Sequence, residues 1–407
     1  MKNPKILSLL LLSFTVWQAL GQTFDCSQGR FSDTIFSELE IQTVQFGQNT
    51  TASGQQQPLM ADVYMPVGDQ ATNRPLIILA FGGSFISGQR ADMAPLAQRY
   101  AKKGHVVASI DYRLYPVFVL GFPDDQAIAE TILGAVHDMR AAVRFFKASA
   151  DQNNPYGIDP GRIYVGGISA GSITAIQAAY LDDRDSLNAF MQSFLDAHGG
   201  QEGDSSLDSL DLNYNSQVQG VINLSGAILD TNFIQAGDPP IFSIQGVDDD
   251  VVPFQTGKAA GLLTVYGSGF IHRVTDRLGI FNILEAVPGG THTDIYFEPQ
   301  FAAQLNAYMD QVDHYFVEKW CTDLTAVATV EPRLRVEVFP NPVRNEFTVR
   351  SDEPVRQVRL INPEGRLVPL EGNDNRYRLD VKLPTGVYLL QMQVGQRWIN
   401  RKVVKVY

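Results

Sequence analysis

A short stretch in the first half of the chain, Gly167-Ile-Ser-Ala-Gly171, constrains the fold more than any other part of the sequence. It follows the apolar run 163–165, which is typical of a strand, and leads into 169–180, where apolar residues have helical spacing. In the order strand, Gly-x-Ser-x-Gly, helix, the serine sits on a tight turn with its hydroxyl raised above a sheet. Glycines are needed because side chains there would collide with the neighbouring strand and helix. The pattern predicts a nucleophile at Ser169, and the alternative is an ordinary Gly/Ser turn.

Apolar runs alternate with helical patterns on both sides of this turn. The predicted strands are 40–45, 61–65, 75–81, 105–110, 162–165, 218–224, 241–245 and 281–287, and predicted helices span 91–103 and 124–150. The first two strands alternate apolar and polar residues and are joined by the turn-rich stretch 47–57, which predicts a hairpin at a sheet edge. The other runs are continuously apolar, as in buried parallel strands. The fold class is therefore α/β, a doubly wound and mainly parallel sheet, with the site beyond the carboxyl ends of its strands.

Candidate partners for Ser169 follow later strands in the order that serine acyl transfer needs. That chemistry uses a base, a carboxylate that orients the base, and donors for the oxyanion. Among the six histidines, only His292 lies in a Gly-rich loop directly after a strand, so it is the predicted base. Asp248, Asp249 and Asp250 follow the strand 241–245, and a turn there could present any of them. We favour Asp249 as the acid; a solvated loop or a weak cation site is the alternative.

The predicted oxyanion donors come from two backbone segments. Gly82 and Gly83 directly follow a buried strand, where their N–H groups can face a substrate without side-chain obstruction. The N–H of Ala170 is the second expected donor. An ordinary strand–helix turn is the alternative for the glycine pair. Arg113, in the nearby Asp-Tyr-Arg-Leu segment, is expected to be a structural ion-pair partner.

The segment 182–216 fits no strand–helix unit. It is rich in Asp, Ser and Gly and has one helical stretch around 187–198. We expect it to form a small lid or cap over the pocket, and a disordered surface insertion is the alternative.

The start of the chain predicts export. Residues 1–21 read as a secretory signal peptide, with two lysines, the apolar core 6–16 and a small-x-small cleavage site. An uncleaved anchor is the alternative, but the apolar run is short for a membrane span, and we expect no span in the mature protein. In an oxidising compartment, Cys26 and Cys321 are expected to form a disulfide between the ends of a catalytic domain at 22–321. Two free buried thiols are the alternative.

The pattern changes after Cys321. Residues 322–332 read as a linker, and short strands with a period of two follow, which predicts a small β-sandwich at 333–407. This unit carries 14 Lys+Arg against 8 Asp+Glu, although the whole chain has a net charge of −12. The charge asymmetry supports separate units, and the acidic total argues against a nucleic-acid partner. A carbohydrate-binding or stabilising module is one interpretation of the sandwich.

The motifs of the catalytic region together resemble a carboxylesterase/lipase of the α/β-hydrolase superfamily over residues 35–320. The matching segments are Phe81-Gly-Gly-Ser-Phe85, Asp111-Tyr-Arg-Leu114, Gly167–Gly171, Gly246–Pro253 and His292. The family's Gly-x-x-Asp-x-x-Val-Pro pattern singles out Asp249. The resemblance implies ester hydrolysis through an acyl-enzyme, with no metal and no organic cofactor. Relatives often carry histidine and three glycines where this chain has Phe81-Gly-Gly-Ser84, so that histidine's contacts cannot be carried over.

Two further functions stay open for the catalytic region. A secreted enzyme with an accessory domain suits polymeric esters, such as polyhydroxyalkanoates or acyl groups on a polysaccharide. A catalytically silent relative that serves as a surface binding protein is the other alternative, although the ordered serine, acid and histidine argue against it.

The C-terminal unit resembles a type A sorting domain of the type IX secretion system. Its matching motifs are Phe339-Pro-Asn-Pro342, Asn362-Pro-Glu-Gly365, Leu383–Tyr388 and Lys402-Val-Val-Lys405. The resemblance implies that residues 333–407 are recognised by the type IX secretion machinery, which delivers the protein to the cell surface or the medium, and that the domain is then removed.

Overall fold

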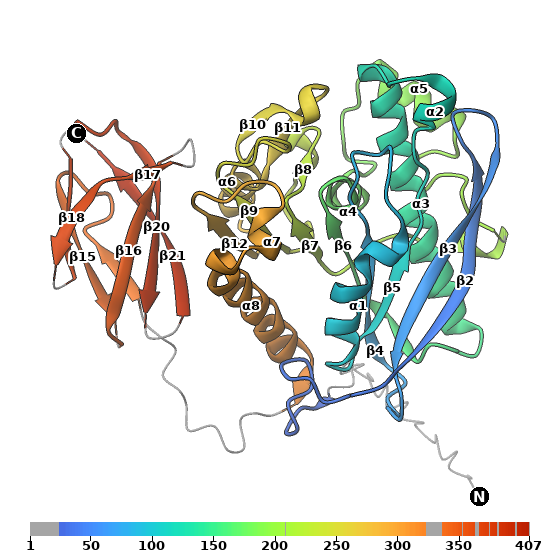
Figure 1. Ribbon diagram of the computed structural model, residues 1–407, viewed down its shortest axis with the longest axis horizontal. Coiled ribbons are helices and arrows are strands. Elements are labelled where there is room, and N and C mark those ends of the chain that lie inside the picture. The colour runs from blue at the N-terminus through green and yellow to red at the C-terminus, as the bar shows by residue number, and fades with distance from the viewer. Residues whose placement is uncertain are drawn as a thin grey trace, which may run out of the picture.

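The computed structural model describes residues 24–322 apart from 208, and residues 336–406 apart from 352, 363–365, 374, 381 and 395–396. The predicted signal peptide (1–21) and nearly all of the predicted linker (322–332) lie outside the described residues. Figure 1 shows a larger body of helices around a sheet and a smaller body of strands.

An eight-stranded sheet forms the centre of the larger body, in the order β12-β9-β7-β6-β4-β5-β3-β2. Its strands are β2 (Leu39–Thr50), β3 (Gln56–Pro66), β4 (Arg74–Ala80), β5 (Val106–Ile110), β6 (Ile158–Ile168), β7 (Val221–Leu224), β9 (Ile241–Gly246) and β12 (Asn282–Val287). The strands from β12 to β5 are parallel, and β3 and β2 are added antiparallel. Every residue of β4 is buried, as its continuous apolar run predicts. The predicted α/β fold class is confirmed.

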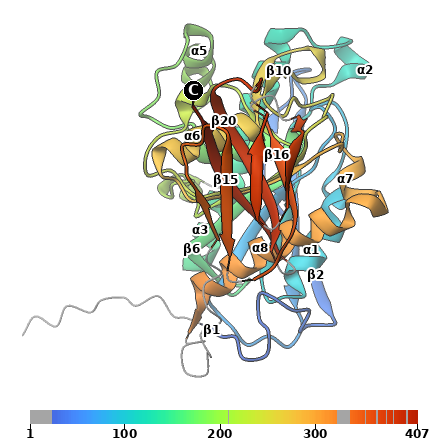
Figure 2. The same ribbon diagram turned by 90° about the vertical axis from the view of Figure 1, so that its left-hand side faces the viewer.

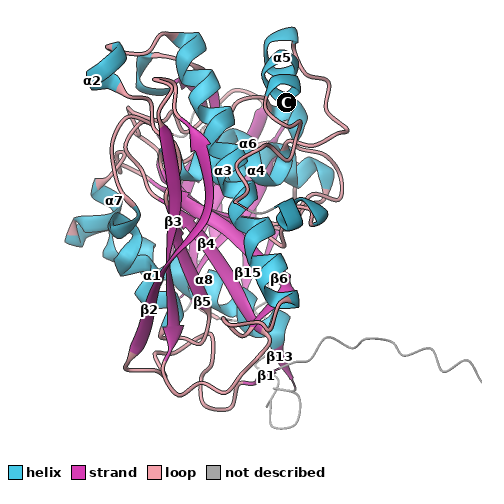
Figure 3. Ribbon diagram, turned by 90° about the vertical axis from the view of Figure 1, so that its right-hand side faces the viewer, coloured by secondary structure: helices cyan, strands magenta, loops and turns pink. Residues whose placement is uncertain are grey.

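Helices cover both faces of this sheet (Figure 3). They are α1 (Ala94–Ala101), α2 (Val117–Leu120), α3 (Asp125–Asp151), α4 (Ala170–Tyr180), α5 (Ala189–Ala197), α6 (Ser268–Leu278), α7 (Asp294–Phe297) and α8 (Ala302–Trp320). On one face, Arg99 of α1 and Asp313 of α8 form a two-bonded ion pair. On the other face, α3 packs against α4. The long α3 begins where predicted because the Asp124 side chain accepts a hydrogen bond from Ala127 N and caps the helix.

The edge hairpin is longer than predicted. Strands β2 and β3 take in most of the stretch 47–57 that we expected to be a turn, and only residues 51–55 connect them. The pairing register shifts at a bulge between Gln45 and Gly47. The error arises because these strands lie at the solvent-facing edge, where Gln, Asn and Thr can pair without being buried.

A small three-stranded sheet stands beside the main one and was not predicted. It consists of β8 (Ala227–Ile228), β10 (Thr256–Lys258) and β11 (Thr264–Gly267). Strands of two to four residues carry too few side chains to show a period of two.

The ends of the larger body are joined covalently. Cys26 and Cys321 form a disulfide, as expected from the sequence. Next to it, β1 (Phe24–Asp25) pairs in parallel with β13 (Cys321–Thr322).

The smaller body is the predicted β-sandwich, with two four-stranded sheets in the orders β14-β15-β19-β18 and β17-β16-β20-β21. The strands are β14 (Val336–Phe339), β15 (Glu346–Ser351), β16 (Val355–Ile361), β17 (Leu367–Val368), β18 (Leu370–Asn373), β19 (Arg376–Leu379), β20 (Gly386–Val394) and β21 (Arg397–Lys405). Alternate residues of β20, namely Tyr388, Leu390, Met392 and Val394, are buried in its core. The period of two predicts strands at 334–339, 347–350, 355–361, 377–381, 386–393 and 398–406. Strands β17 and β18 were not predicted, because they are short and lie in a turn-rich stretch.

The sandwich lies beside β12, the edge strand of the main sheet (Figures 1 and 2). Buried Ile361 of β16 packs with Ala286 of β12 and with Phe254. None of the helices in the described part of the chain is long and apolar enough to cross a membrane.

Candidate active site

Ser169 occupies the sharp turn between β6 and α4. Its φ of 54° and ψ of −120° fall in a region that non-glycine residues rarely adopt. A Cβ on Gly171 would lie 2.1 Å from Ala80 O, and one on Gly167 would lie 2.4 Å from the same atom. Neither distance is sterically possible, so glycine at both positions allows the turn to pack against β4.

Ser169, His292 and Asp249 form one hydrogen-bonded row. His292 Nε2 lies 2.8 Å from Ser169 Oγ, and His292 Nδ1 lies 2.8 Å from Asp249 Oδ2. With the proton on Nδ1, the imidazole donates to the carboxylate and leaves Nε2 free to accept the serine proton. The three side chains come from separate strand ends, after β6, β9 and β12, and the sheet brings these ends together.

The adjacent acids differ in burial. Asp249 is 7% exposed, whereas Asp248 and Asp250 are exposed to solvent. The second carboxylate oxygen of Asp249, Oδ1, accepts hydrogen bonds from Val251 N at 3.0 Å and Val252 N at 2.8 Å. The turn therefore points Asp249 at His292, and it points the two neighbours outward.

Three predicted backbone donors lie around or next to the serine turn. A Cβ on Gly82 would lie 3.2 Å from Ser169 Cβ, so this residue touches the nucleophile. Gly83 has a φ of 126°, and a Cβ there would lie 2.1 Å from Ser87 O. Within the described residues, no hydrogen bond is donated by the amide of Gly82 or Gly83. The amide of Ala170 is the first of α4, a position that has no intrahelical acceptor.

The position where relatives often carry a histidine is filled by a stacked aromatic pair. The Phe81 and Tyr112 rings stack with centroids 4.4 Å apart, and Tyr112 OH donates to Phe81 O at 2.7 Å. This pair fixes the strand end that leads into Gly82. Arg113, next to Tyr112, pairs with buried Asp138 at 3.0 Å, as expected of a structural residue.

Two residues that sequence reasoning missed support the histidine loop. Ser225 Oγ lies 2.6 Å from Tyr296 OH and donates to His292 O at 3.4 Å. Burial raises the pKa of Tyr296, so its hydroxyl keeps its proton and can donate to Ser225. Ser225 directly follows β7 and has a φ of 53°. Its place after a strand is the signal that could have identified it.

Gln245, the penultimate residue of β9, supports the acid in the same way. Its Nε2 donates to Asp249 Oδ2 at 3.2 Å and to Val252 O at 2.7 Å. Its Oε1 accepts from Ser268 N at 3.0 Å, so the amide joins the acid turn to the start of α6.

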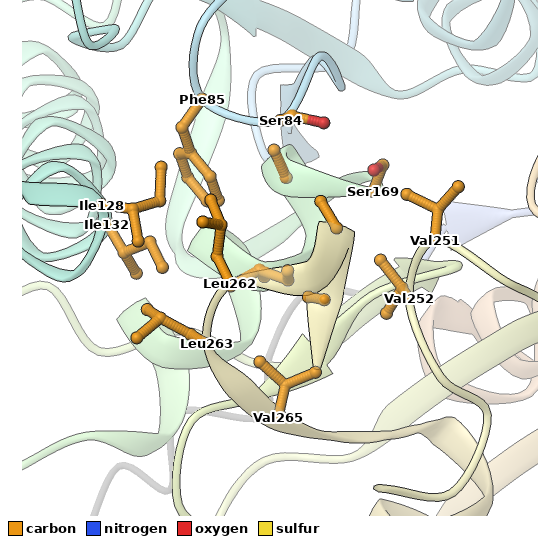
Figure 4. A pocket seen from close by; sticks show the side chains of 14 residues that line it. Ser84, Phe85, Ile128, Ile132, Ser169, Val251, Val252, Leu262, Leu263 and Val265 are labelled. Atoms are coloured by element: carbon orange, nitrogen blue, oxygen red, sulfur yellow. The ribbon is translucent and has the colours of Figure 1, made fainter. Parts of the chain in front are cut away.

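A small pocket of about 50 Å³ adjoins Ser169 (Figure 4). Its walls are almost wholly apolar. They include Phe85, Ile128 and Ile132 on one side, Val251 and Val252 on the opposite side, and Leu262, Leu263 and Val265 between them. Such a pocket fits an apolar group next to the nucleophile.

The segment 182–216 lies along α3, and its role as a lid stays a prediction. Glu202 pairs with Arg144 of α3 at 2.8 Å, and Ser205 O accepts from Gln48 N of β2 at 3.0 Å. No described residue of this segment lines the pocket at Ser169; the part of the wall next to α3 comes from residues 259–265. The buried guanidinium of Arg144 needs acceptors, which the segment supplies.

No cluster of three or more His, Cys, Asp or Glu side chains able to hold a metal ion is found among the described residues. Three other histidines are buried away from Ser169, and burial lowers the pKa of His105 to about 3, of His137 to about 3 and of His272 to about 4.

A mainly parallel sheet, a serine on a strand–helix turn, and a histidine and a carboxylate from later strand ends define the class of fold: the larger body has the fold of an α/β-hydrolase. Within that class, residues 61–228 match the BD-FAE family. Residues 337–406 match the secretion system C-terminal sorting domain, which confirms the sorting interpretation of the sandwich. The chain thus joins a segment that matches the BD-FAE family to a segment that matches the sorting domain.

Similar proteins are esterases. A probable isoprenylcysteine alpha-carbonyl methylesterase of Oryza sativa is 25% identical over 258 residues, which is 58% of this chain and 56% of the relative. A second one from the same plant is 32% identical over 119 residues, 29% of this chain and 24% of the relative. The chain therefore spans about half of the first curated relative and less of the second. An esterase of Thermogutta terrifontis, solved with propionate, shares the fold at a TM-score of 0.50 and 18% identity, covering 70% of this chain and 97% of its own.

Proposed function

We propose that the protein is a secreted serine carboxylesterase that hydrolyses carboxylic esters through an acyl-enzyme. The hydrogen-bonded row of Ser169, His292 and Asp249 carries this proposal. Serine hydroxyls are weak nucleophiles unless a base removes their proton, and a base within 3 Å that is itself oriented by a carboxylate meets that need.

In the first half-reaction, Ser169 Oγ attacks the ester carbonyl carbon while His292 Nε2 takes the hydroxyl proton. The carbonyl oxygen becomes an oxyanion, which the amides of Ala170, Gly82 and Gly83 are proposed to bind. Asp249 stabilises the imidazolium. The C–O bond to the alcohol then breaks, His292 returns the proton to the leaving oxygen, and the acyl group stays on Ser169.

In the second half-reaction, water takes the place of the alcohol. His292 accepts a proton from the water as its oxygen attacks the acyl carbon, and the imidazolium then protonates Ser169 Oγ as the acid leaves. Ser225, itself bonded to Tyr296, holds the His292 carbonyl throughout, so the imidazole moves little between its two partners.

Export is proposed to use both ends of the chain. Residues 1–21 would direct passage through the inner membrane, and the type IX secretion machinery would recognise 333–407 and deliver the enzyme to the cell surface or the medium. We propose the matching domain limits, 22–321 for catalysis and 322–332 for the linker. Deletion of 333–407 should abolish delivery and leave hydrolysis of soluble esters unchanged.

The pocket predicts a preference for short acyl chains. The pocket has a volume of about 50 Å³. One water needs roughly 10–15 Å³, so about three or four non-hydrogen atoms fit. Overpacking costs about 1–3 kcal/mol, which lowers kcat/KM about 5- to 150-fold. We expect p-nitrophenyl acetate and butyrate to be hydrolysed faster than octanoate and palmitate, measured by initial rates of the mature protein.

Ser169→Ala, assayed alongside, is the control for this ester series. Activity that the variant lacks supports the esterase and gives its acyl preference. Inactivity of the wild type on every ester, together with no labelling by a fluorophosphonate, would instead favour a silent surface binding protein. A faster reaction with octanoate than with butyrate would show that the pocket opens beyond the volume described.

A polymeric, water-insoluble ester is the second candidate substrate, and an exposed apolar segment favours it. Residues 117–122 include Phe118 at 102% and Phe122 at 85% relative exposure. The segment lies next to the pocket because Tyr115 N donates to Phe85 O, and it ends just before the cap of α3, which carries Ile128. Exposed apolar groups of this size mark binding sites.

Serine substitution of these two phenylalanines tests that candidate. Each buried Phe contributes about 1.5–3 kcal/mol, so the Phe118→Ser/Phe122→Ser variant should lose at least about tenfold in initial rate on a polyester film. Its kcat/KM on p-nitrophenyl butyrate should stay within about twofold of wild type. Val67→Ser, half-exposed beyond β3 at the opposite end of the sheet, is the matched control. Equal losses on the film and on the soluble ester would count against surface binding.

A further inference from the structure

Part of the outward face of β20 in the sandwich is buried, around Gln391, which an isolated sandwich does not explain. Alternation along the strand places Leu390 and Met392 in the sandwich core and turns Leu389 and Gln391 outward. Gln391 nevertheless has no exposed surface, and Leu389 packs with Ala286 of the catalytic domain. The edge strand β12 is what covers this face.

The polar contact inside this interface joins an amide to a carboxyl group. Gln391 Nε2 donates to Glu285 Oε1 at 3.3 Å and to Ala286 O at 3.4 Å. Glu285 is fully buried. The other oxygens of the two groups, Glu285 Oε2 and Gln391 Oε1, are also buried and have no hydrogen-bond partner among the described residues. Both of these oxygens are hydrogen-bond acceptors, and buried acceptors without a donor are costly. A single proton between them would give one a donor and the other a bond to accept.

The surroundings disfavour an ionised carboxylate. Burial raises the pKa of Glu285 from its ordinary 4.5 to about 8, and the positive charge of Arg359 on β16 opposes this with a smaller effect. His272 of α6 is neutral because burial lowers its pKa to about 4. The other titratable groups on elements around β12 and the adjoining groove are Arg273, Asp276 and Arg277 of α6, Lys402 of β21, and Asp313 and Tyr315 of α8, of which Asp313 is already paired with Arg99 and Lys103. The remaining acids, His and Lys of α8 are exposed.

We infer that Glu285 is a neutral carboxylic acid whose O–H donates to Gln391 Oε1, so that an acid–amide pair with two hydrogen bonds fastens the sorting domain to the edge of the catalytic sheet. The proton satisfies both unpaired oxygens at once. The docked sandwich also packs against the apolar side chains of Phe254 and Leu284. In addition, Gln391 Nε2 donates a hydrogen bond to the backbone carbonyl of Ala286 on the edge strand.

Docking in this form depends on pH with a definite sign. The docked state holds a proton that an exposed Glu285 releases above its ordinary pKa of 4.5. The docking equilibrium constant is therefore greatest below pH 4.5 and falls as the pH rises, by up to about tenfold per pH unit, until the docked acid itself ionises at about pH 8. The sorting domain is therefore expected to dock more strongly at low pH than at high pH.

Small-angle X-ray scattering of the mature full chain at pH 5, 7 and 9 tests this inference. For wild type, the ratio of extended to compact form should rise at least about tenfold from pH 5 to pH 9. Glu285→Gln replaces the acid by an amide, which donates at every pH, and should stay compact across the range. Glu346→Gln removes the same charge from an exposed site on β15 and should behave as wild type.

A second variant acts from the sandwich side, in case the substitution in β12 disturbs folding. Gln391→Glu places two carboxyl groups together, so the chain should extend at a lower pH than wild type. A wild type whose dimensions do not change with pH, or a Glu285→Gln variant that extends as wild type does, would overturn the inference. Scattering does not depend on turnover, so neither result bears on the proposed esterase.

Discussion

Replacing Ser169 by alanine should lower kcat on p-nitrophenyl butyrate by at least about ten-thousandfold. The hydroxyl is the only group in the row that can form the acyl bond, and its loss leaves the oxyanion donors with an attacking water that nothing positions. The fold should tolerate the change, since alanine keeps the Cβ at the turn. A fluorophosphonate probe should label the wild type and leave the variant unlabelled.

Ser172→Ala is the matched control, because this serine lies one turn along α4. Its hydroxyl donates to Asn223 at 2.6 Å and is buried away from His292. Loss of that bond costs about 1 kcal/mol of stability and should change kcat by no more than about twofold. If Ser172→Ala abolished labelling and Ser169→Ala did not, the nucleophile would be assigned to the wrong residue.

Replacing Asp249 by asparagine should lower kcat about ten-thousandfold. The amide nitrogen would meet His292 Nδ1 and favour the tautomer that carries its proton on Nε2, which cannot accept from Ser169. The bonds from Val251 N and Val252 N reach Oδ1, which asparagine retains, so the turn should keep its shape. Steady-state kinetics and thermal unfolding together separate lost catalysis from lost folding.

The neighbouring acids provide controls of the same charge and size. Asp248→Asn and Asp250→Asn alter exposed side chains and should keep kcat within about twofold of wild type. Full activity in Asp249→Asn with loss in either neighbour would falsify the assignment of the acid.

The main sheet was predictable because its strands carry the strongest local signals. A run such as Leu76–Ala80 is apolar throughout. A strand that is buried on both faces of a sheet needs such a continuous apolar run, so the run is a strong signal for it. The elbow glycines, the disulfide and the order of serine, acid and histidine were also readable, since each depends on a residue type that few others can replace. The edge hairpin was harder, because exposed strands tolerate the polar residues of turns.

What the sequence did not show depends on contacts between distant segments. The pocket wall at 259–265 lies in a loop region whose place is set by the pairing of β8, β10 and β11, none of which has a readable period. The sequence shows Glu285 only as a single acid in an apolar strand, because its contact with Gln391 depends on how the sandwich lies against β12. The contacts of the segment 182–216 could not be predicted for the same reason, since its anchors are arginines of α3 that lie over 50 residues earlier.

The disulfide between Cys26 and Cys321 determines how the catalytic domain bears mechanical load. The sorting domain follows Cys321, so any tension that a translocating machine applies to the tail enters the catalytic domain at that residue. There the force divides between two parts of the domain. One part is α8, and the other is the N-terminal segment, which is reached through the disulfide and the β1–β13 pairing. Peeling α8 away from the sheet would require moving both ends together. We therefore expect the catalytic domain to stay folded when its C-terminal end is pulled, because the disulfide holds both of its ends together.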